Sequence, residues 1–402
     1  MTRPPLEVAD VIRHYGATYL ARYGHVTSTA QQRVLRALTL CRTAALGGHT
    51  TACDHCGHLE SSSNSCRNRH CPKCQGSAQA AWLADRQQEV LNVPSFHVVF
   101  TLPDTLNALA LRNPQRLYSL LFHTVAETLL TIAQDPTHLA AHIGFLALLH
   151  TWGQQLHYHP HLHCVVPGGG LSPDGTAWVP CAPNFFLPVK VLSRFFRRRF
   201  LEGLTQARTA QALTLTGPCH ALAHPQAWQR LMPRLHEHEW VVYAKRPMRE
   251  PAHVLTYLAR STHRVAIANR RLLALEAGRV TFRWRDSTHG NRPRTMTLDA
   301  VECIRRFLLH VLPHGFQHIR HDGFLANRVR QAQLTRCRQL LQPSVASSHV
   351  GAPVTGDAGA AAAALPRAEM CPICQTGRML VVETLFVHRA VWDLGVPVLD
   401  TS

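Results

Sequence analysis

The sequence contains the run His157-Tyr158-His159-Pro160-His161-Leu162-His163, followed by the apolar Cys164-Val165-Val166 and then by three glycines, 168–170. Alternating histidines, an apolar run and a glycine turn predict a buried strand over 161–166. Because alternate side chains of a strand share one face, we expect His161 and His163 side by side. Two such imidazoles bind a divalent metal and leave coordination positions open for a substrate oxygen. The alternative is a chance His-x-His pair in a chain with 28 histidines.

Length and charge restrict the kind of protein. The chain has 402 residues, too many for one compact core, so two to four modules are expected. Its 42 Lys+Arg against 24 Asp+Glu give a net charge of +18, which favours a polyanionic partner such as nucleic acid. A membrane surface is the rival, but no apolar run approaches the roughly 20 residues of a membrane span, and the first residues do not resemble a signal peptide. We therefore predict a cytoplasmic protein, associated with the nucleoid, with no membrane partner.

The order of the expected elements predicts an α+β fold, because strands and helices alternate too irregularly for a doubly wound sheet. Helices are expected over 6–47, with a break at Gly24 and a capping box formed by Ser28 and Gln31. Further strands are expected over 96–101, 143–152 and 240–243, a hairpin over 280–298, and helices over 190–213 and 300–311. Residues 343–368, rich in Ala, Gly, Ser and Pro, are predicted to form a flexible linker.

A cysteine-rich segment covers residues 53–74. In a reducing compartment the 13 cysteines of the chain are expected as metal ligands or buried thiols. Two Cys-x-x-Cys pairs with 14 residues between them predict a structural zinc ribbon, formed by Cys53, Cys56, Cys71 and Cys74. Cys66, His58 and His70 are surplus, and they could replace one ligand or support a second metal. A third pair, Cys371 and Cys374, has no partner pair nearby in the sequence, so it is half a zinc ribbon or an unpaired remnant.

Several segments resemble, in their order along the chain, the rolling-circle insertion-sequence transposases of the insertion-sequence-ninety-one type. They are 41–49 (CRTAALGGH), 65–75 (SCRNRHCPKCQ), 96–103 (FHVVFTLP), 150–154 (HTWGQ), the His-x-His strand, 243–247 (YAKRP) and 307–313 (FLLHVLP). The match runs from about residue 10 to residue 330. This collinearity is more specific than any single motif.

The resemblance implies N-terminal helices with a zinc ribbon, followed by a nuclease of the HUH class (His, hydrophobic, His) with a mainly antiparallel sheet flanked by helices. Such enzymes nick and rejoin single-stranded DNA at element ends and targets through a 5′-phosphotyrosine. The domains expected are a helical zinc-binding domain over 1–93, the nuclease over 94–330, a linker over 331–370 and a tail over 371–402. A homodimer is one expected assembly.

The nucleophile segment of the family resembles 257–264 (YLARSTHR), which makes Tyr257 the candidate nucleophile. Many relatives carry a second tyrosine four residues later, where this chain has Ser261. A second departure is 248–251 (MREP), where the family has a glycine-rich segment. Tyr257 is then the sole nucleophile, as in single-tyrosine enzymes of this class, whereas Tyr243 is expected in the core.

A metal, Mg²⁺ or Mn²⁺, held by His161 and His163 would polarise the scissile phosphate. The third ligand is expected to be Gln154, at the end of the preceding strand, with His157 and His159 as alternatives. Basic residues predicted to contact DNA phosphates are Arg194, Arg197, Arg198, Arg199, Lys245, Arg246, Arg260 and Arg264. Two other functions fit these residues: a catalytically inactive zinc-ribbon DNA-binding protein, and a hydrolase whose metal activates water.

Overall fold

The computed structural model describes residues 6–342 and 370–386, except 77, 78, 80, 81, 84–86, 88, 246, 249, 251, 252, 255, 256, 258–265, 287 and 288. The chain divides into two compact units. One consists of Met1–Val34 and Arg69–Pro343, and the other of Leu35–Asn68 and Ser344–Ser402. Each unit is therefore discontinuous, whereas the domains predicted from the sequence are continuous stretches. The linker predicted over 343–368 lies outside the described residues.

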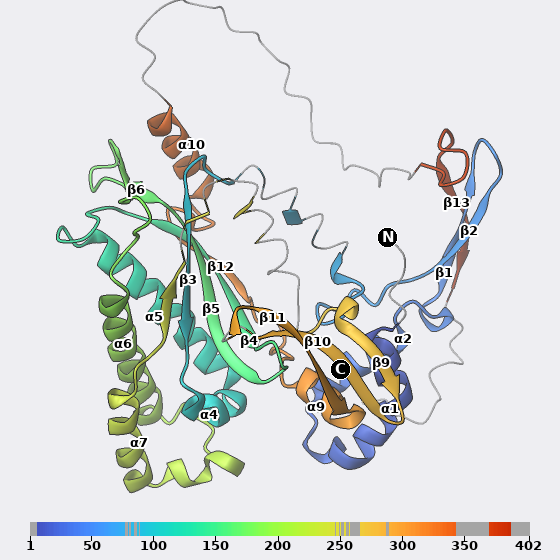
Figure 1. Ribbon diagram of the computed structural model, residues 1–402, viewed down its shortest axis with the longest axis horizontal. Helices are drawn as coiled ribbons and strands as arrows, with labels where there is room; N and C mark the ends of the chain where they lie inside the picture. The colour runs from blue at the N-terminus through green and yellow to red at the C-terminus, as the bar shows by residue number, and fades with distance from the viewer. Residues whose placement is uncertain are drawn as a thin grey trace, which may run out of the picture. The chain divides into compact units, whose positions relative to one another are not determined.

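A five-stranded antiparallel sheet organises the first unit (Figure 1). Its strands are β3 (Ser95–Thr101), β4 (Gly144–Trp152), β5 (Tyr158–Pro167), β8 (Val242–Ala244) and β12 (Ile319–Gly323). The order β12-β4-β5-β3-β8 puts the histidine-bearing strand β5 in the middle. Four of these strands lie where the sequence pattern predicts them, and the α+β fold with a mainly antiparallel sheet is confirmed.

One face of this sheet packs against helices α5 (Pro114–Gln134) and α6 (Val189–Thr209) (Figure 1). Phe100 of β3 meets Phe196 of α6 edge to face, with ring centroids 5.2 Å apart. Leu162 of β5 is fully buried in the same core. Each such side chain contributes about 1.5–3 kcal/mol through burial. Because side chains alternate along β5, burying Leu162 here directs His161 and His163 to the opposite face.

A second sheet of the same unit packs with helices α1 (Val8–Tyr23) and α9 (Ala300–Leu308) (Figure 1). Its strands are β9 (Leu272–Glu276), β10 (Arg279–Asp286) and β11 (Arg292–Asp299), in the order β11-β10-β9. The predicted hairpin over 280–298 is thus confirmed. The Asp299 carboxylate caps α9 by accepting hydrogen bonds from the backbone N–H of Val301 and of Glu302, at 2.9 and 3.2 Å. Helix α9 ends at Leu308, three residues before the end predicted for it.

The N-terminal helices follow the sequence signals. Helix α1 is succeeded at Gly24 by a short 3-10 helix, and α2 covers Thr29–Leu40. The predicted capping box is present, since the backbone N–H of Ser28 donates to Gln31 Oε1 (2.9 Å) and the N–H of Gln31 donates to Ser28 Oγ (3.3 Å). None of the helices in the described part of the chain is long and apolar enough to cross a bilayer.

Helix α10 (Arg330–Leu341) corrects one expectation, because the linker was predicted to begin at residue 331. Its Leu334 and Cys337 side chains are buried, and this burial holds the segment as a helix. Further helices and strands of the first unit are α4 (Asn107–Arg112), α7 (Pro225–Glu237), β6 (Gly169–Leu171) and β7 (Trp178–Pro180).

The second unit contains a three-stranded antiparallel sheet (Figure 1). Its strands are β1 (Gly48–Cys53), β2 (Leu59–Ser63) and β13 (Met379–Leu385), with β1 in the centre. Strand β13 comes from the segment that was predicted to be a tail. It pairs with β1 from Gly48 opposite Leu385 to Cys53 opposite Met379.

Candidate active site and cysteine clusters

Three imidazoles converge on the open face of the five-stranded sheet. His161 and His163 of β5 lie side by side as predicted, with ring centroids 4.7 Å apart. His150 of β4 is the third member, and its ring centroid lies 4.4 Å from that of His163. One nitrogen from each ring lies within 4.8 Å of the others, which is close enough for a single metal ion to bind all three.

The structure places His150, and not Gln154, beside the pair, and this corrects the expected third ligand. Strand β4 ends at Trp152, so Gln154 lies in the following turn, where its carbonyl accepts a hydrogen bond from Arg271. Of the two alternatives, His157 is exposed, and His159 lies 3.5 Å from an Asp104 carboxylate oxygen. Sequence reasoning missed His150, although it opens the 150–154 motif.

A β-bulge explains why His150 joins the site. Trp152 pairs with Tyr158, and a regular hairpin in this register would set His150 opposite Pro160, with its side chain on the other face from His161. The register shifts between His150 and Trp152, so His150 lies opposite His161 instead. One extra residue on β5 therefore brings the third imidazole to the open face.

Burial keeps the imidazoles of His161 and His163 neutral. It lowers the pKa of His161 to about 4 and holds the pKa of His163 well below its usual value. Both rings are therefore unprotonated at pH 7, the form that binds a metal. His161 Nδ1 lies 2.7 Å from the carbonyl oxygen of His159, so it carries the ring proton and donates it there. This leaves Nε2 of His161 as the lone-pair nitrogen.

Tyr257 lies on the same face as the three histidines. Its hydroxyl is 2.8 Å from Nε2 of His97, a β3 residue, and this nitrogen is 2.7 Å from Nδ1 of His163. The Tyr257 ring stands 4.6 Å from that of His97 and 6.3 Å from that of His163, centroid to centroid. Apolar contacts with a cluster that includes Leu148 and Val254 also hold the tyrosine.

His97 is a further site residue that sequence reasoning did not single out. Burial lowers its pKa to about 3, and the charge of Lys245 contributes to this shift. The signal was present in the sequence, because His97 is the one histidine of a predicted strand, 96–101. Only the pairing of β3 with β5 puts it on the face of His163, since Val99 lies opposite His163 and His97 is two residues from Val99.

The other tyrosine considered, Tyr243, is not in the core as expected. It lies on β8 opposite Val99, so it belongs to the same face of the sheet as His163, but 53% of it is exposed. Strand β8 is an edge strand, which in the described part of the chain pairs with β3 alone. Ser261, which replaces the second tyrosine of many relatives, lies outside the described residues.

The basic residues predicted to contact DNA divide into separate groups. Lys245 is exposed next to the site, and its backbone N–H donates to the His97 carbonyl at 2.9 Å. Arg246, Arg260 and Arg264 lie outside the described residues.

The arginines at 194 and 197–199 belong to α6, which covers the opposite face of the sheet from the histidines. Arg199 pairs with Glu127 (2.7 Å), Arg198 with Glu202 (3.7 Å), and Arg197 donates to a backbone carbonyl. Arg194 is exposed. The structure therefore does not bring this cluster to the histidines.

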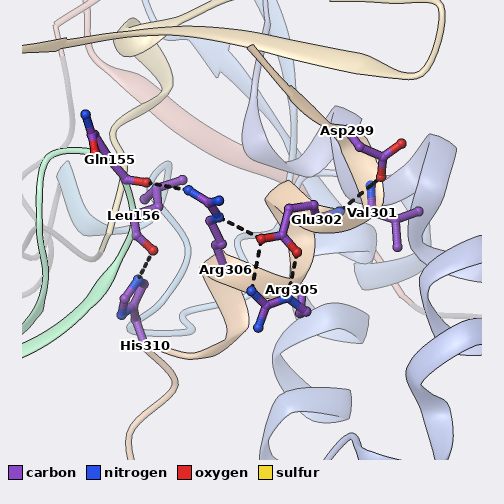
Figure 2. A network of polar contacts seen from close by, with 8 residues as sticks. All are labelled: Gln155, Leu156, Asp299, Val301, Glu302, Arg305, Arg306 and His310. Atoms are coloured by element: carbon purple, nitrogen blue, oxygen red, sulfur yellow. Dashed lines mark hydrogen bonds and ion pairs between the residues drawn. The ribbon is translucent and has the colours of Figure 1, made fainter. Parts of the chain in front are cut away.

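Helix α9 holds the loop that connects the two histidine-bearing strands (Figure 2). Arg306 donates to the Gln155 carbonyl at 3.3 Å, and His310 Nε2 donates to the Leu156 carbonyl at 3.4 Å. Glu302 fixes Arg306 through a 2.7 Å ion pair and also pairs with Arg305 at 2.6 Å. The loop that sets the register of His150 against His161 is thus held by Arg306 of α9 and by His310, which follows the helix.

Four cysteines of the second unit form a cluster in which the sulfurs lie within 4.8 Å of one another. The predicted ribbon is corrected, because Cys53 and Cys56 group with Cys371 and Cys374. Cys71 and Cys74 belong to the first unit, where Cys71 is buried and Cys74 half-buried. Four thiols match the tetrahedral donor set of a structural Zn²⁺.

Cys66 and His70, the possible extra ligands of the predicted ribbon, lie in different units. Cys66 is half-buried in the second unit, outside this cluster. His70 is buried in the first unit, and its Nε2 accepts a hydrogen bond from the backbone N–H of Leu312 at 3.3 Å.

Comparisons with known proteins agree with this architecture. A family model described as "Putative transposase" matches residues 144–333, and another described as "Transposase zinc-binding domain" matches residues 11–102. The chain is 53% identical over 393 residues to "Putative transposase y4qJ" of Sinorhizobium fredii (strain NBRC 101917 / NGR234), which covers 95% of this chain and 96% of that protein.

A second relative is "Transposase for insertion sequence element IS801" of Pseudomonas savastanoi pv. phaseolicola. It is 29% identical over 308 residues, which is 75% of this chain and 72% of that protein. No solved structure matches the chain. From the two family models and the coverage of the first relative, the chain belongs to the insertion-sequence transposases of the insertion-sequence-ninety-one type, which carry a transposase zinc-binding domain.

Proposed function

We propose that this transposase nicks and rejoins single-stranded DNA at insertion-sequence ends, with Tyr257 as the nucleophile and a 5′-phosphotyrosine as the covalent intermediate. The observation that carries the proposal is the chain of contacts from the Tyr257 hydroxyl to His97 Nε2 (2.8 Å) and on to His163 Nδ1 (2.7 Å). These contacts support Tyr257 as the residue that would attack a phosphate bound at the histidine group.

The three imidazoles of His150, His161 and His163 are the residues that would hold Mg²⁺ or Mn²⁺. The ion would supply positive charge next to the scissile phosphate and to the leaving oxygen. Three neutral ligands leave that charge undiminished, which suits a dianionic transition state. Mn²⁺, a first-row transition-metal ion, binds imidazole nitrogen more readily than Mg²⁺, which prefers oxygen, so we expect higher activity with Mn²⁺.

The residues around Tyr257 provide for its activation. A phenol has a pKa of about 10 and is a weak nucleophile until its proton is removed. Nε2 of the neutral His97 accepts the 2.8 Å hydrogen bond of the hydroxyl and so orients its oxygen. The low pKa of His97 leaves it too weakly basic to keep the phenolic proton, which passes to solvent. The phenolic oxygen forms a bond to phosphorus, the bond from phosphorus to O3′ breaks, and O3′ takes up a proton from solvent to become a 3′-hydroxyl. Rejoining is the reverse reaction, with a 3′-hydroxyl attacking the phosphotyrosine.

Other groups would bind rather than react. Lys245, which is exposed beside His97, would contact a DNA phosphate. The zinc of the zinc-binding domain is assigned a structural role, because four thiolates leave no open coordination position.

With one candidate nucleophile per chain, a homodimer would bring two nucleophiles to the two ends of an element. A reaction on the DNA of the element and of the chromosome suits a cytoplasmic protein that is associated with the nucleoid.

The deciding experiment uses an oligonucleotide of an element end that is labelled in one of two places. With Mn²⁺ and a 3′ label, the label should become attached to the protein and resist denaturation. With a 5′ label it should appear in a shorter free strand that ends in a 3′-hydroxyl. Nicking without an adduct would instead indicate a hydrolase whose metal activates water, and DNA binding without nicking would indicate an inactive DNA-binding protein.

A further inference from the structure

We propose that Cys53, Cys56, Cys371 and Cys374 bind one structural Zn²⁺ that joins the two distant stretches of the second unit. Cys53 Sγ lies 3.6 Å from Cys374 Sγ, and Cys56 Sγ lies 3.7 Å from Cys371 Sγ. Four thiolates placed tetrahedrally at about 2.3 Å from a zinc ion have sulfurs about 3.8 Å apart. The two distances therefore match a zinc site. They are much too long for disulfides, in which the sulfurs are about 2.05 Å apart.

The two Cys-x-x-Cys turns have the same backbone conformation. In each, the carbonyl of the first cysteine accepts a hydrogen bond from the N–H four residues later: Gly57 to Cys53 at 3.1 Å, and Gln375 to Cys371 at 3.0 Å. Gly57 and Gln375 also share a left-handed backbone, with φ of 72° and 57°. A glutamine seldom adopts this conformation, so a specific turn must hold it there. Two like turns facing each other are the usual construction of a zinc ribbon.

Backbone N–H groups point at the sulfurs. The N–H groups of His55 and Cys56 lie 3.4 and 3.5 Å from Cys53 Sγ, and the N–H of Gly377 lies 3.3 Å from Cys374 Sγ. Such bonds stabilise thiolates, which are the form of cysteine that binds a metal.

The C-terminal turn is fitted closely against the N-terminal one. The backbone N–H of Arg378 donates to Asp54 Oδ1 at 2.7 Å, and the N–H of Asp54 donates to the Arg378 carbonyl at 3.1 Å. A Cβ at Gly377 would overlap Cys53 Sγ and come within 2.7 Å of Asp54 Oδ1. The glycine is therefore required for the approach of the two pairs.

Hydrophobic burial does little to hold strand β13 in place. Six of its seven residues are exposed, among them Val381 (62%) and Val382 (59%). A small three-stranded sheet with such exposed strands is only marginally stable by itself, and small units of this kind are commonly stabilised by a metal. Zinc would supply the missing stabilisation, because ligands separated by about 300 residues are brought together only in the folded chain.

Neither family model reaches the C-terminal pair, since their matches end at residues 102 and 333. The zinc-binding part of this chain would therefore extend beyond the N-terminal domain and include residues near 371–386. The C-terminal Cys-x-x-Cys, which the sequence left as half a ribbon, is completed by the pair at 53 and 56.

The test counts zinc atoms per chain in the purified full-length protein by mass spectrometry of the metal. Cys371→Ser/Cys374→Ser should lose one zinc relative to the wild type, Cys53→Ser/Cys56→Ser should lose one, and the quadruple variant should also lose one rather than two. Cys181→Ser, a half-buried cysteine outside this cluster, is the matched control and should keep all the zinc. Full retention of zinc by Cys371→Ser/Cys374→Ser would overturn the proposal.

A second measurement needs no cysteine substitution, so a variant that fails to fold cannot obscure the answer. Cys56 is exposed and Cys374 half-buried, so both thiols should react with N-ethylmaleimide unless metal protects them. We expect both to be protected in the zinc-loaded protein and to become reactive at the same chelator concentration. Gly377→Ala should lower the chelator concentration required, by about tenfold. Rapid alkylation of Cys374 in the zinc-loaded wild type would rule the site out.

Discussion

His150 lies directly opposite His161 across β4 and β5, in a register that a bulge between His150 and Trp152 creates. We predict that His150→Ala lowers Mn²⁺-dependent nicking by at least about 100-fold, as do His161→Ala and His163→Ala. Gln154→Ala should leave nicking nearly unchanged, because Gln154 contributes its backbone carbonyl to the structure. DNA affinity should persist in all four variants, because phosphate contacts supply most of it. Normal nicking by His150→Ala would remove it from the site.

Tyr257→Phe removes one oxygen and keeps the ring against its apolar neighbours, so stability should change little while the covalent adduct disappears. Tyr243→Phe is the matched control, since Tyr243 lies on the same face of the sheet but is more exposed. The measurement is a denaturing gel with the 3′-labelled strand. An adduct that persists in Tyr257→Phe and vanishes in Tyr243→Phe would show that the nucleophile is Tyr243.

Ser261→Tyr restores the two-tyrosine spacing of many relatives. It should leave the first nick roughly unchanged, because Tyr257 is sufficient for it. Mapping the modified tyrosine by peptide mass spectrometry checks this expectation. An adduct on residue 261 alone would contradict it.

His97→Ala should slow adduct formation by about 10- to 100-fold, because the Tyr257 hydroxyl loses the hydrogen bond that orients it, with little change in DNA affinity. His97→Gln keeps a side chain that accepts a hydrogen bond from the Tyr257 hydroxyl but is not basic, so its rate should stay close to that of the wild type. A rate with His97→Gln as low as that with His97→Ala would instead show that His97 takes the proton.

The salt dependence of DNA binding should distinguish Lys245 from the arginines of α6. Lys245→Ala is expected to weaken single-stranded DNA binding and to reduce the slope of log K against log salt by about 1 or less, the effect of one lost phosphate contact. Arg198→Ala, on the helix that covers the other face, should change the slope less, because Arg198 is already paired with Glu202. Fluorescence anisotropy between 50 and 200 mM NaCl measures both. A larger effect of Arg198→Ala would place DNA on the α6 side.

The Glu302 network gives a pH prediction. Hydrogen bonds from Arg305 and then Arg306 lower the pKa of Glu302 from 4.5 to about 2 in the folded protein. The folded state therefore favours the carboxylate, and its stabilisation is present above pH 4.5 and is lost as the pH falls towards 2. Glu302→Gln should lower the free energy of unfolding by about 1 kcal/mol at pH 7, since the group is partly exposed.

The gap in the free energy of unfolding between wild type and Glu302→Gln should narrow below pH 4.5. Thermal unfolding of both proteins at each pH measures it. Comparing the two proteins at equal pH cancels the effect of acid on the cysteines, which both share. A gap that widens as the pH falls would show that Glu302 does not act through its charge.

Much of the fold depended on local patterns and was therefore predictable. The period of two along β5 put His161 and His163 on one face, and the Ser28–Gln31 capping box marked the start of α2. Such signals work because they depend on neighbours within a few residues. The collinear motifs also indicated the transposase family, which the comparisons confirm.

Only the tertiary structure decided which distant residues meet. A single-residue shift in strand register turned His150 towards His161, and the sequence has no clear mark of such a bulge. The partners of Cys53 and Cys56 proved to be more than 300 residues away, although a nearer pair has the spacing of a ribbon. Spacing along the chain limits which cysteines can meet, but the pairing of β13 with β1 chooses among them. Likewise, the arginines of α6 form a basic run in the sequence, and the packing of Phe196 against Phe100 sets them on the face away from the histidines.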